Sequence, residues 1–288
     1  MTKSPNDKIP VQRLLVPPYI LRISRILTWI SPTLASRFGA RLFLTPFRYE
    51  LPKREQEMDA QSRQWKVRVP DINREIVVYQ YGDSPKKVLL VHGWSGRGTQ
   101  MAVMAKQLLE NGYSVLSFDA PGHGKAPGKR SMMPFFYKAI EFLDDRYGPF
   151  TASIGHSLGG MALLKAANKA SFEKIIVVGT ANSISHITNE FARNMHMNDK
   201  VATKIKAYFD RRYRTDLDAL SGAVSAARVP IPTLVIHDVH DVDVSVTCAY
   251  EIHSSLPYGE LLITEGLGHR KILGDAQVIK KILEFLSV

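Results

Sequence analysis

The pentapeptide Gly155-His156-Ser157-Leu158-Gly159 constrains this chain more than any other feature. It lies between a strand-like run, Thr151 to Ile154, and a helix-like run, Met161 to Lys169. A serine at such a strand-to-helix turn projects from a tight, strained backbone, so its neighbours must be small. The glycines at both ends of the motif carry no Cβ, and Gly160 adds clearance where helix and strand cross. The pattern predicts that the Ser157 hydroxyl is exposed at the carboxyl edge of a sheet.

Partners that could activate this serine occur elsewhere in the chain. Asp241 lies just after an apolar, strand-like run, and His269 lies just after another. Upstream, the apolar run Val88 to Val91 leads into His92-Gly93-Trp94. A serine hydroxyl is a poor nucleophile at neutral pH unless a base, commonly histidine, takes its proton. A buried carboxylate then holds that histidine in one tautomer and stabilises its charged form.

The order Ser, Asp, His, with a His-Gly loop upstream, resembles the α/β-hydrolase family over roughly residues 65 to 288. This resemblance implies an α/β fold, with a mostly parallel sheet flanked by helices and a helical cap insertion. It implies that Ser157 is the nucleophile, His269 the general base and then acid, and Asp241 the orienting carboxylate. It also implies an oxyanion hole made by the backbone N–H groups of Trp94 and Leu158.

The identity of the acid is the least fixed of these roles. After the strand that precedes the acid, the family pattern is roughly H-G-x-x-D-x-x-V-P, which makes Asp241 the acid. This chain departs from that pattern twice, with Asp238 in place of Gly and Ser245 in place of Pro. Asp238 and Asp243 therefore stay open as alternatives. Position 94 is similarly open, because Gly93 or Ser95 could provide the upstream amide.

A serine nucleophile favours acyl transfer to water through an acyl-enzyme. Members of the family that act on haloalkanes or epoxides use an aspartate instead, so this chain does not resemble them. The interpretation is a serine esterase acting on a carboxylic ester or thioester, including lipid-like substrates, with no cofactor. C–C bond hydrolysis, peptidase activity and a non-enzymatic membrane or protein interaction module are the alternatives. His237-x-x-His240 beside aspartates resembles a metal site, but no metal is predicted because zinc would need a further convergent ligand.

Two regions are expected to be added to the hydrolase domain. The sequence predicts a basic, helical N-terminal extension, broken by prolines, over residues 1–60. It predicts the hydrolase domain over residues 61–288. Within that domain, residues of about 182–230 interrupt the strand–helix alternation and predict the cap. Apolar cap residues such as Phe191, Met195 and Met197 predict either an acyl site or core packing.

The net charge of +11 is concentrated near the N-terminus, where Val11 to Tyr49 contains no Asp or Glu. Helical projection of Ile20 to Ile30 places isoleucines on one face and arginines on the other. Such a helix suits an anionic membrane surface, packing on the hydrolase body, or a basic organelle-targeting segment, and all three stay open. No nucleic-acid motif accompanies the charge, so nucleic-acid binding is not expected. The single cysteine fits a reducing compartment, and we expect a cytoplasmic protein, with residues 11–49 providing peripheral contact with the inner membrane surface. The oligomeric state is left open.

Overall fold

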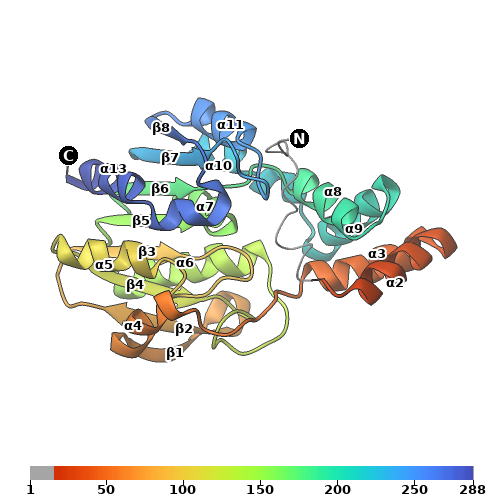
Figure 1. The fold of residues 1–288 in the computed structure, drawn as a ribbon, viewed down its shortest axis with the longest axis horizontal. Coiled ribbons are helices and arrows are strands. Elements are labelled where there is room, and N and C mark those ends of the chain that lie inside the picture. The colour runs from red at the N-terminus through yellow and green to blue at the C-terminus, as the bar shows by residue number, and fades with distance from the viewer. Residues whose placement is uncertain (1–15, 288) are drawn as a thin grey trace, which may run out of the picture.

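The computed structural model describes residues 16–287, which form a twisted sheet with helices on both faces (Figure 1). The eight strands of this part of the chain lie in the order β1-β2-β4-β3-β5-β6-β7-β8. Strand β2 is antiparallel to both of its neighbours, and all other pairs are parallel. Their bounds are β1 Arg63–Val69, β2 Arg74–Tyr81, β3 Lys87–Val91, β4 Ser114–Asp119, β5 Ala152–His156, β6 Lys174–Val178, β7 Thr233–Asp238 and β8 Gly259–Thr264. The prediction of a mostly parallel α/β sheet is confirmed.

The helices precede the sheet, connect its strands or follow it. They are α2 Pro18–Ile30, α3 Pro32–Phe43, α4 Lys53–Gln61, α5 Ala102–Glu110, α6 Met133–Tyr147, α7 Leu158–Ala166, α8 Ile184–Asn194, α9 Asp199–Tyr213, α10 Gly222–Ala226, α11 Thr247–Ser255, α12 Gly268–Lys271 and α13 Ala276–Ser287. Short 3₁₀ turns are η2 Pro70–Ile72, η3 Leu217–Leu220 and η4 Ile272–Gly274. Helix α6 begins at Met133, and Pro134 fits the first turn of this helix.

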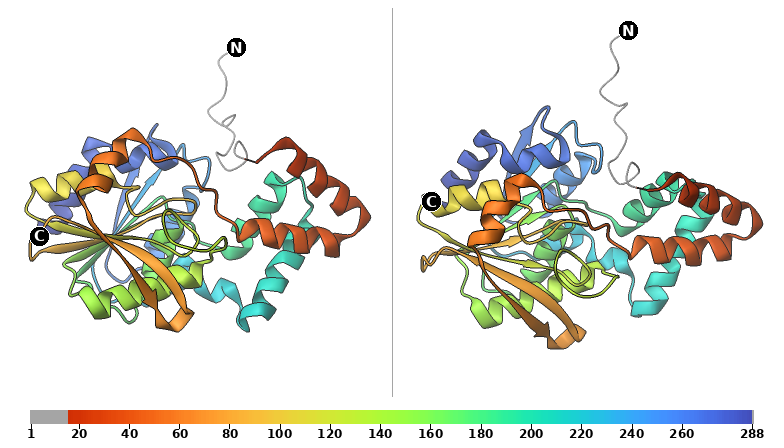
Figure 2. Two further views of the ribbon diagram at one scale, coloured as in Figure 1. Left: turned by 90° about the horizontal axis from the view of Figure 1, so that it is seen from below. Right: turned by 60° about the horizontal axis from the view of Figure 1, so that its bottom comes forward.

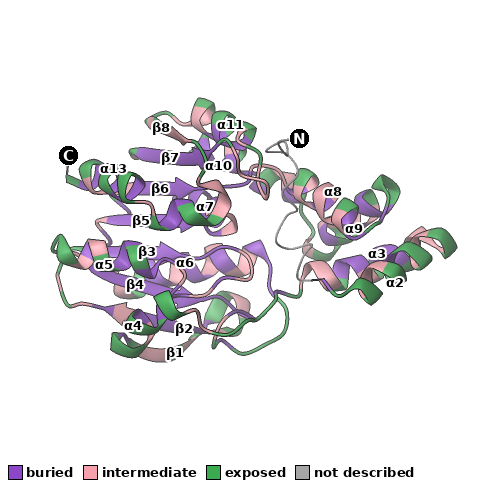
Figure 3. Cartoon of the chain, viewed as in Figure 1, coloured by how far each residue is buried: buried purple, intermediate pink, exposed green. Residues whose placement is uncertain are grey.

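The apolar central strands separate two layers of helices. Successive residues of a strand point to opposite faces of the sheet. In β3, Val88 and Leu90 belong to the core formed with α5 and α13, whereas Leu89 and Val91 belong to the core formed with α6 and α7. Both faces of these strands are therefore buried (Figure 3), as is usual for parallel sheets.

The N-terminal helices and the cap insertion pack together as one helical layer at one side of the sheet. Figure 2 shows α2 and α3 lying beside α8 and α9, although these pairs are far apart in the sequence. Gly39 allows α3 to approach α9 closely, since a Cβ at this position would lie 2.8 Å from Ile205 Cδ1 and 3.1 Å from Met197 Sδ. We call α2, α3, α8 and α9 the composite cap.

Helix α2 packs through only part of its surface. Ser24 is fully buried and Leu27 is half-buried, whereas Ile26 and Ile30 are more than half exposed and Trp29 is 88% exposed. The predicted apolar face is thus split between packing and solvent. Residues 11–15 of the basic stretch lie outside the described residues, as do the first residues of the predicted extension.

The segment between α3 and α4 is attached to the loops after β3 and β4. The Arg48 guanidinium donates to the carbonyl oxygens of Gly122 (3.2 Å) and Ala126 (2.6 Å). The Phe47 amide donates to Ser95 Oγ at 3.0 Å. The N-terminal extension is therefore held against the rim of the sheet. No helix within residues 16–287 combines the length and apolarity needed to cross a bilayer.

Candidate active site

Ser157 occupies the sharp turn between β5 and α7. Its φ of 54° and ψ of −120° lie outside the common regions for a non-glycine residue, which marks local strain. A Cβ at Gly159 would lie 2.4 Å from the Val91 carbonyl oxygen, and one at Gly155 would lie 2.6 Å from Gly160 Cα. These contacts explain why the serine is flanked by glycines, as the sequence pattern indicates.

Asp241 and His269 meet in the loops after β7 and β8. Asp241 Oδ2 accepts a hydrogen bond from His269 Nδ1 at 2.6 Å, and the aspartate side chain is 1% exposed. Its other oxygen, Oδ1, accepts from the amides of Asp243 (2.9 Å) and Val244 (2.8 Å). Gly179, at φ +58°, makes room for this pair, because a Cβ there would lie 3.2 Å from His269 Nδ1. The hydrogen bond leaves His269 Nε2 as the ring nitrogen available to a nucleophile.

Ser157 and His269 line the same cavity, but Ser157 Oγ forms no hydrogen bond to His269 among the described residues. Catalytic hydrogen bonds often tighten only when substrate is bound. The rings of His156 and His269 lie with their centroids 4.6 Å apart, and His156 Nε2 lies 2.9 Å from the His269 carbonyl oxygen. Burial, followed by the nearby His269, lowers the pKa of His156 well below its ordinary value. A neutral His156 that donates from Nε2 therefore fixes the backbone that carries His269.

The two alternative acids occupy different places. Asp238 is 1% exposed and accepts from the amides of His240 and Leu267, each at 2.9 Å, and from the Thr264 hydroxyl at 2.8 Å. It thereby ties the β7 loop to the loop that carries His269. The Asp243 side chain lines the cavity without contacting His269 in the described structure. The geometry thus places Asp241, and neither alternative, against the histidine.

Two backbone amides are candidates for an oxyanion hole. The Leu158 amide is the first of α7, where helix N–H groups have no partner within the helix. The Gly93 amide already donates to Gln100 Oε1 at 2.8 Å, which removes it as a donor to substrate. The Trp94 amide donates to no protein acceptor among residues 16–287. Trp94 and Leu158 also line the cavity with Ser157, so both remain suitable.

The cavity above Ser157 has a volume of about 590 Å³ and is mainly apolar. Its walls come from the composite cap, the segment after α3 and the rim loops. The Phe43 ring packs edge to face on Phe191, with ring centroids 5.1 Å apart, and its centroid lies 5.3 Å from that of Phe209. These contacts join the N-terminal part of the wall to the cap insertion. Of the predicted apolar cap residues, Phe191 and Met195 line the cavity, whereas Met197 packs against Gly39.

The comparisons with known proteins agree with this architecture. The model of the serine aminopeptidase S33 family matches residues 82–222, which include β3 to η3 and the serine turn. Solved structures with the same fold cover most of the chain at low identity. An esterase from Pyrococcus furiosus is 18% identical with a TM-score of 0.62, over 85% of this chain and 96% of its own. The chain belongs to the α/β-hydrolase fold family.

Two further structures bear on this α/β-hydrolase. An esterase from Exiguobacterium antarcticum is 15% identical with a TM-score of 0.62, over 78% of this chain and all of its own. A bacterial membrane phospholipase A, described as a virulence factor, is 16% identical with a TM-score of 0.60. This match covers 96% of the present chain and 98% of the phospholipase, so it includes most of the N-terminal extension. No curated protein sequence matches the chain.

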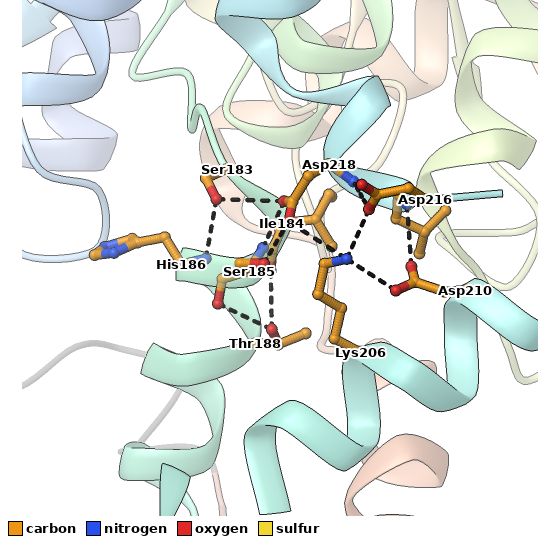
Figure 4. Close-up of polar contacts among 10 residues, drawn as sticks. Ser183, Ile184, Ser185, His186, Thr188, Lys206, Asp210, Asp216 and Asp218 are labelled. Carbon is orange, nitrogen blue, oxygen red and sulfur yellow. Dashed lines mark hydrogen bonds and ion pairs between the residues drawn. The ribbon is translucent and has the colours of Figure 1, made fainter. Parts of the chain in front are cut away.

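Lys206 fastens the cap insertion of this α/β-hydrolase (Figure 4). Its ammonium group contacts Asp210 at 2.8 Å, Asp216 at 2.7 Å and Asp218 at 3.4 Å. Asp218 also accepts from the Ser185 amide at 2.9 Å, at the start of α8. The cluster thus joins α8, α9 and η3, each of which contributes to the cavity wall. No local sequence pattern indicates this cluster, because its residues are spread over 34 positions of the chain.

The remaining histidines of the sequence patterns serve the scaffold. His237 is fully buried with Nε2 3.0 Å from the Val244 carbonyl oxygen, and His92 Nε2 accepts from the Ala120 amide at 3.1 Å. Burial lowers the pKa of both, which keeps them neutral. Within residues 16–287 no grouping of His, Cys, Asp and Glu side chains is arranged to hold a metal ion.

Proposed function

We propose that this protein is a serine hydrolase that cleaves a carboxylic ester or thioester through an acyl-enzyme on Ser157. The observation that carries the proposal is the 2.6 Å hydrogen bond between the buried Asp241 side chain and His269, which lines the same cavity as a serine in a strained turn. That arrangement supplies a weak nucleophile with a base, and supplies the base with an orienting carboxylate.

In the proposed reaction, His269 Nε2 takes the hydroxyl proton as Ser157 Oγ attacks the carbonyl carbon. Negative charge on the carbonyl oxygen is received by the amides of Trp94 and Leu158. Collapse of this intermediate breaks the bond to the leaving alcohol or thiol, which takes the proton from His269. Water then attacks the acyl-enzyme with His269 again as base, releasing the carboxylic acid and restoring Ser157. Asp241 holds the Nδ1–H tautomer and stabilises the imidazolium throughout.

The cavity supports an apolar acyl group. Aromatic and aliphatic side chains from the composite cap and the segment after α3 surround the space above Ser157. Burial of apolar surface contributes roughly 25 cal/mol per Å², so each further methylene that fits the cavity should strengthen binding. We therefore propose a substrate with a medium or long acyl chain.

We also propose that the protein is cytoplasmic and binds an anionic membrane surface peripherally through α2. The exposed part of α2 combines Ile26, Trp29 and Ile30 with the exposed arginines Arg22 and Arg25. Such a surface suits insertion among lipid headgroups with electrostatic attraction to anionic lipids. The similarity to a membrane phospholipase A that extends over the N-terminal region supports this proposal.

Membrane binding is best tested by a single substitution. Deleting residues 1–60 would remove Phe43 and Phe47 from the cavity wall, so a truncation would confuse binding with catalysis. Trp29→Glu should reduce co-sedimentation with phosphatidylserine-containing vesicles. The control is Tyr258→Glu, which changes a 64% exposed aromatic residue outside α2 and should leave co-sedimentation unchanged. Equal sedimentation of both variants and the wild type would contradict a docking role for α2.

The S33 family match makes an aminopeptidase the second candidate. Such an enzyme needs a carboxylate to hold the substrate ammonium group. Asp243 and Glu190 line the cavity, but Glu190 is paired with Arg193 at 2.7 Å. The predominantly apolar wall favours the acyl ester.

The decisive experiment is hydrolysis of nitrophenyl esters of increasing acyl length, with Ser157→Ala as the control. Aminoacyl nitroanilides form a second panel. The proposal predicts ester turnover that rises with chain length, peaks, and vanishes in the variant. Turnover of the anilides alone would support the peptidase, and no turnover on either panel would favour C–C substrates or a non-enzymatic interaction module.

A further inference from the structure

One sector of the cavity rim is cationic, in contrast to the apolar cap. Arg270 and Lys271 follow His269 directly on α12, and Arg54 lies at the start of α4. All three line the cavity that contains Ser157, and all three are exposed. Their elements are neighbours, because α5 packs against both α4 and η4. A Cβ at Gly274 of η4 would lie 3.8 Å from Val103 of α5, which shows how closely the two approach.

These cations are only partly neutralised by the protein. Arg54 lies 3.6 Å from Glu55, but Glu55 is shared with Arg97 at 3.7 Å. Arg270 and Lys271 form no ion pair within residues 16–287. Two carboxylates, Glu190 and Asp243, also line the cavity, and Glu190 is paired with Arg193. Three cations and two carboxylates therefore line the cavity, which leaves a local excess of positive charge.

The positions of the apolar cap, Ser157 and the rim cations along the cavity indicate which part of a substrate the cations contact. An acyl chain against the cap places its carbonyl carbon at Ser157, and the leaving group must then lie outside the apolar region. The rim sector formed by Arg54, Arg270 and Lys271 carries guanidinium and ammonium groups. These groups are the protein's usual partners for phosphate.

We propose that the substrate is an acyl ester or thioester whose leaving group carries a phosphate, which Arg54, Arg270 and Lys271 bind. The inference rests on the proposed hydrolase function and specifies its substrate class. A glycerol phosphate and the phosphates of a pantetheine-type thiol share this chemistry. The rim cations contact the leaving group and leave the proton transfers to His269.

The test uses matched substrates that differ only in the phosphate. One pair is decanoyl glycerol and decanoyl glycerol phosphate, and the other is a decanoyl thioester of N-acetylcysteamine and the same thioester of coenzyme A. The measured quantity is the ratio of kcat/KM for the phosphate-bearing member to that of its neutral partner. The double variant Arg270→Gln with Lys271→Gln removes two rim cations. Its matched control is Lys66→Gln with Arg74→Gln, which removes two exposed cations from the opposite edge of the sheet.

The wild type should prefer the phosphate in at least one pair, mainly through KM. The rim variant should lower that ratio about tenfold, the size expected for two charge-assisted contacts at an exposed rim, and the control should not. Salt near 1 M should erase the preference of the wild type, because the Debye length falls to about 3 Å. The pair that shows the effect identifies the source of the phosphate.

Three results would overturn the inference, and they can be told apart. If neutral esters are hydrolysed while neither pair shows a phosphate preference, the substrate class is wrong and the hydrolase proposal stands. If the rim and control variants lower the ratio equally, the effect is one of net charge rather than of a site. Absence of turnover on every substrate would refute the hydrolase proposal together with the inference.

Discussion

Replacing Asp238 with asparagine should weaken the fold much more than it alters the chemistry. The side chain accepts from the amides of His240 and Leu267 and from the Thr264 hydroxyl, at 2.8 to 2.9 Å. Buried hydrogen bonds to a charged group contribute about 1.5–3 kcal/mol each. Asparagine keeps one acceptor oxygen but turns an NH₂ group toward the remaining donors. Losing one or two of these bonds should lower the free energy of unfolding by about 2–5 kcal/mol.

The effect should depend on pH in a defined direction. Burial raises the pKa of Asp238, but hydrogen bonds from Gly268, Leu267 and Thr264 outweigh it, so the folded-state pKa lies below the ordinary 3.8. A carboxylate with a lowered folded pKa contributes stability above the unfolded pKa and loses it as the pH falls toward the folded value. The difference between wild type and Asp238→Asn should therefore be full at pH 7 and shrink below about pH 4.

Urea unfolding followed by tryptophan fluorescence at several pH values measures this difference, and Asp241→Asn is the matched comparison. The amide oxygen introduced by Asp241→Asn can still accept from the Asp243 and Val244 amides, so stability should change little. The NH₂ group of that variant would face His269 Nδ1, however, and kcat should fall about 10⁴-fold as expected for the wrong tautomer. Unchanged stability with lost activity in Asp238→Asn would refute this reasoning and make Asp238 the acid.

Three further substitutions test the supports of the site. Lys206→Met leaves three aspartates facing one another, so calorimetry should show that the free energy of unfolding falls by about 1–2 kcal/mol. The KM for long-chain esters should rise, and an unchanged KM would mean that the cluster does not support the cavity. In Gly160→Ala the new Cβ would lie 2.0 Å from Thr180 Oγ1, so expression and activity should fall. Adding Thr180→Ala removes that contact and should restore part of both. If it restores neither, the strain does not arise at Thr180. His156→Phe removes the donor to the His269 carbonyl oxygen and should lower kcat about tenfold and change its pH profile, whereas an unchanged kcat would make His156 a packing residue only.

The strongest local patterns predicted the parts of the fold that depend on neighbouring residues. Apolar runs such as Val88 to Val91 and the glycines around Ser157 act through contacts within one strand–turn–helix unit. Their consequences, a buried parallel strand and a strained turn, could be derived before any tertiary contact was known. The resemblance to the α/β-hydrolase family then supplied the partners of Ser157, which no local pattern could have brought together.

Tertiary contacts limited the rest of the prediction. The extension and the cap insertion were expected as separate parts, yet the approach at Gly39 and the aromatic contacts of Phe43 join them into one wall. A glycine inside a helix gives no sign of which helix it faces. The sequence likewise gives no sign of the role of Arg48, because its acceptors are carbonyl oxygens 74 and 78 positions away.

The departure at Asp238 shows what a mismatch with a family pattern can mean. At that position the pattern has a glycine, which cannot hydrogen-bond through a side chain. The aspartate instead braces the loops that carry Asp241 and His269. An aspartate at a position where the family pattern has a glycine is therefore a sequence signal for such a brace as well as for a competing acid.

The central claim is that Ser157 is an activated nucleophile, and labelling with a fluorophosphonate tests it most directly. Such a reagent reacts with a serine whose proton is taken by a neighbouring base. Mass spectrometry of the intact protein should show one adduct per chain, the digest should place it on Ser157, and Ser157→Ala should stay unlabelled. Equal labelling of Ser157→Ala, or no labelling of a folded wild type, would contradict the account.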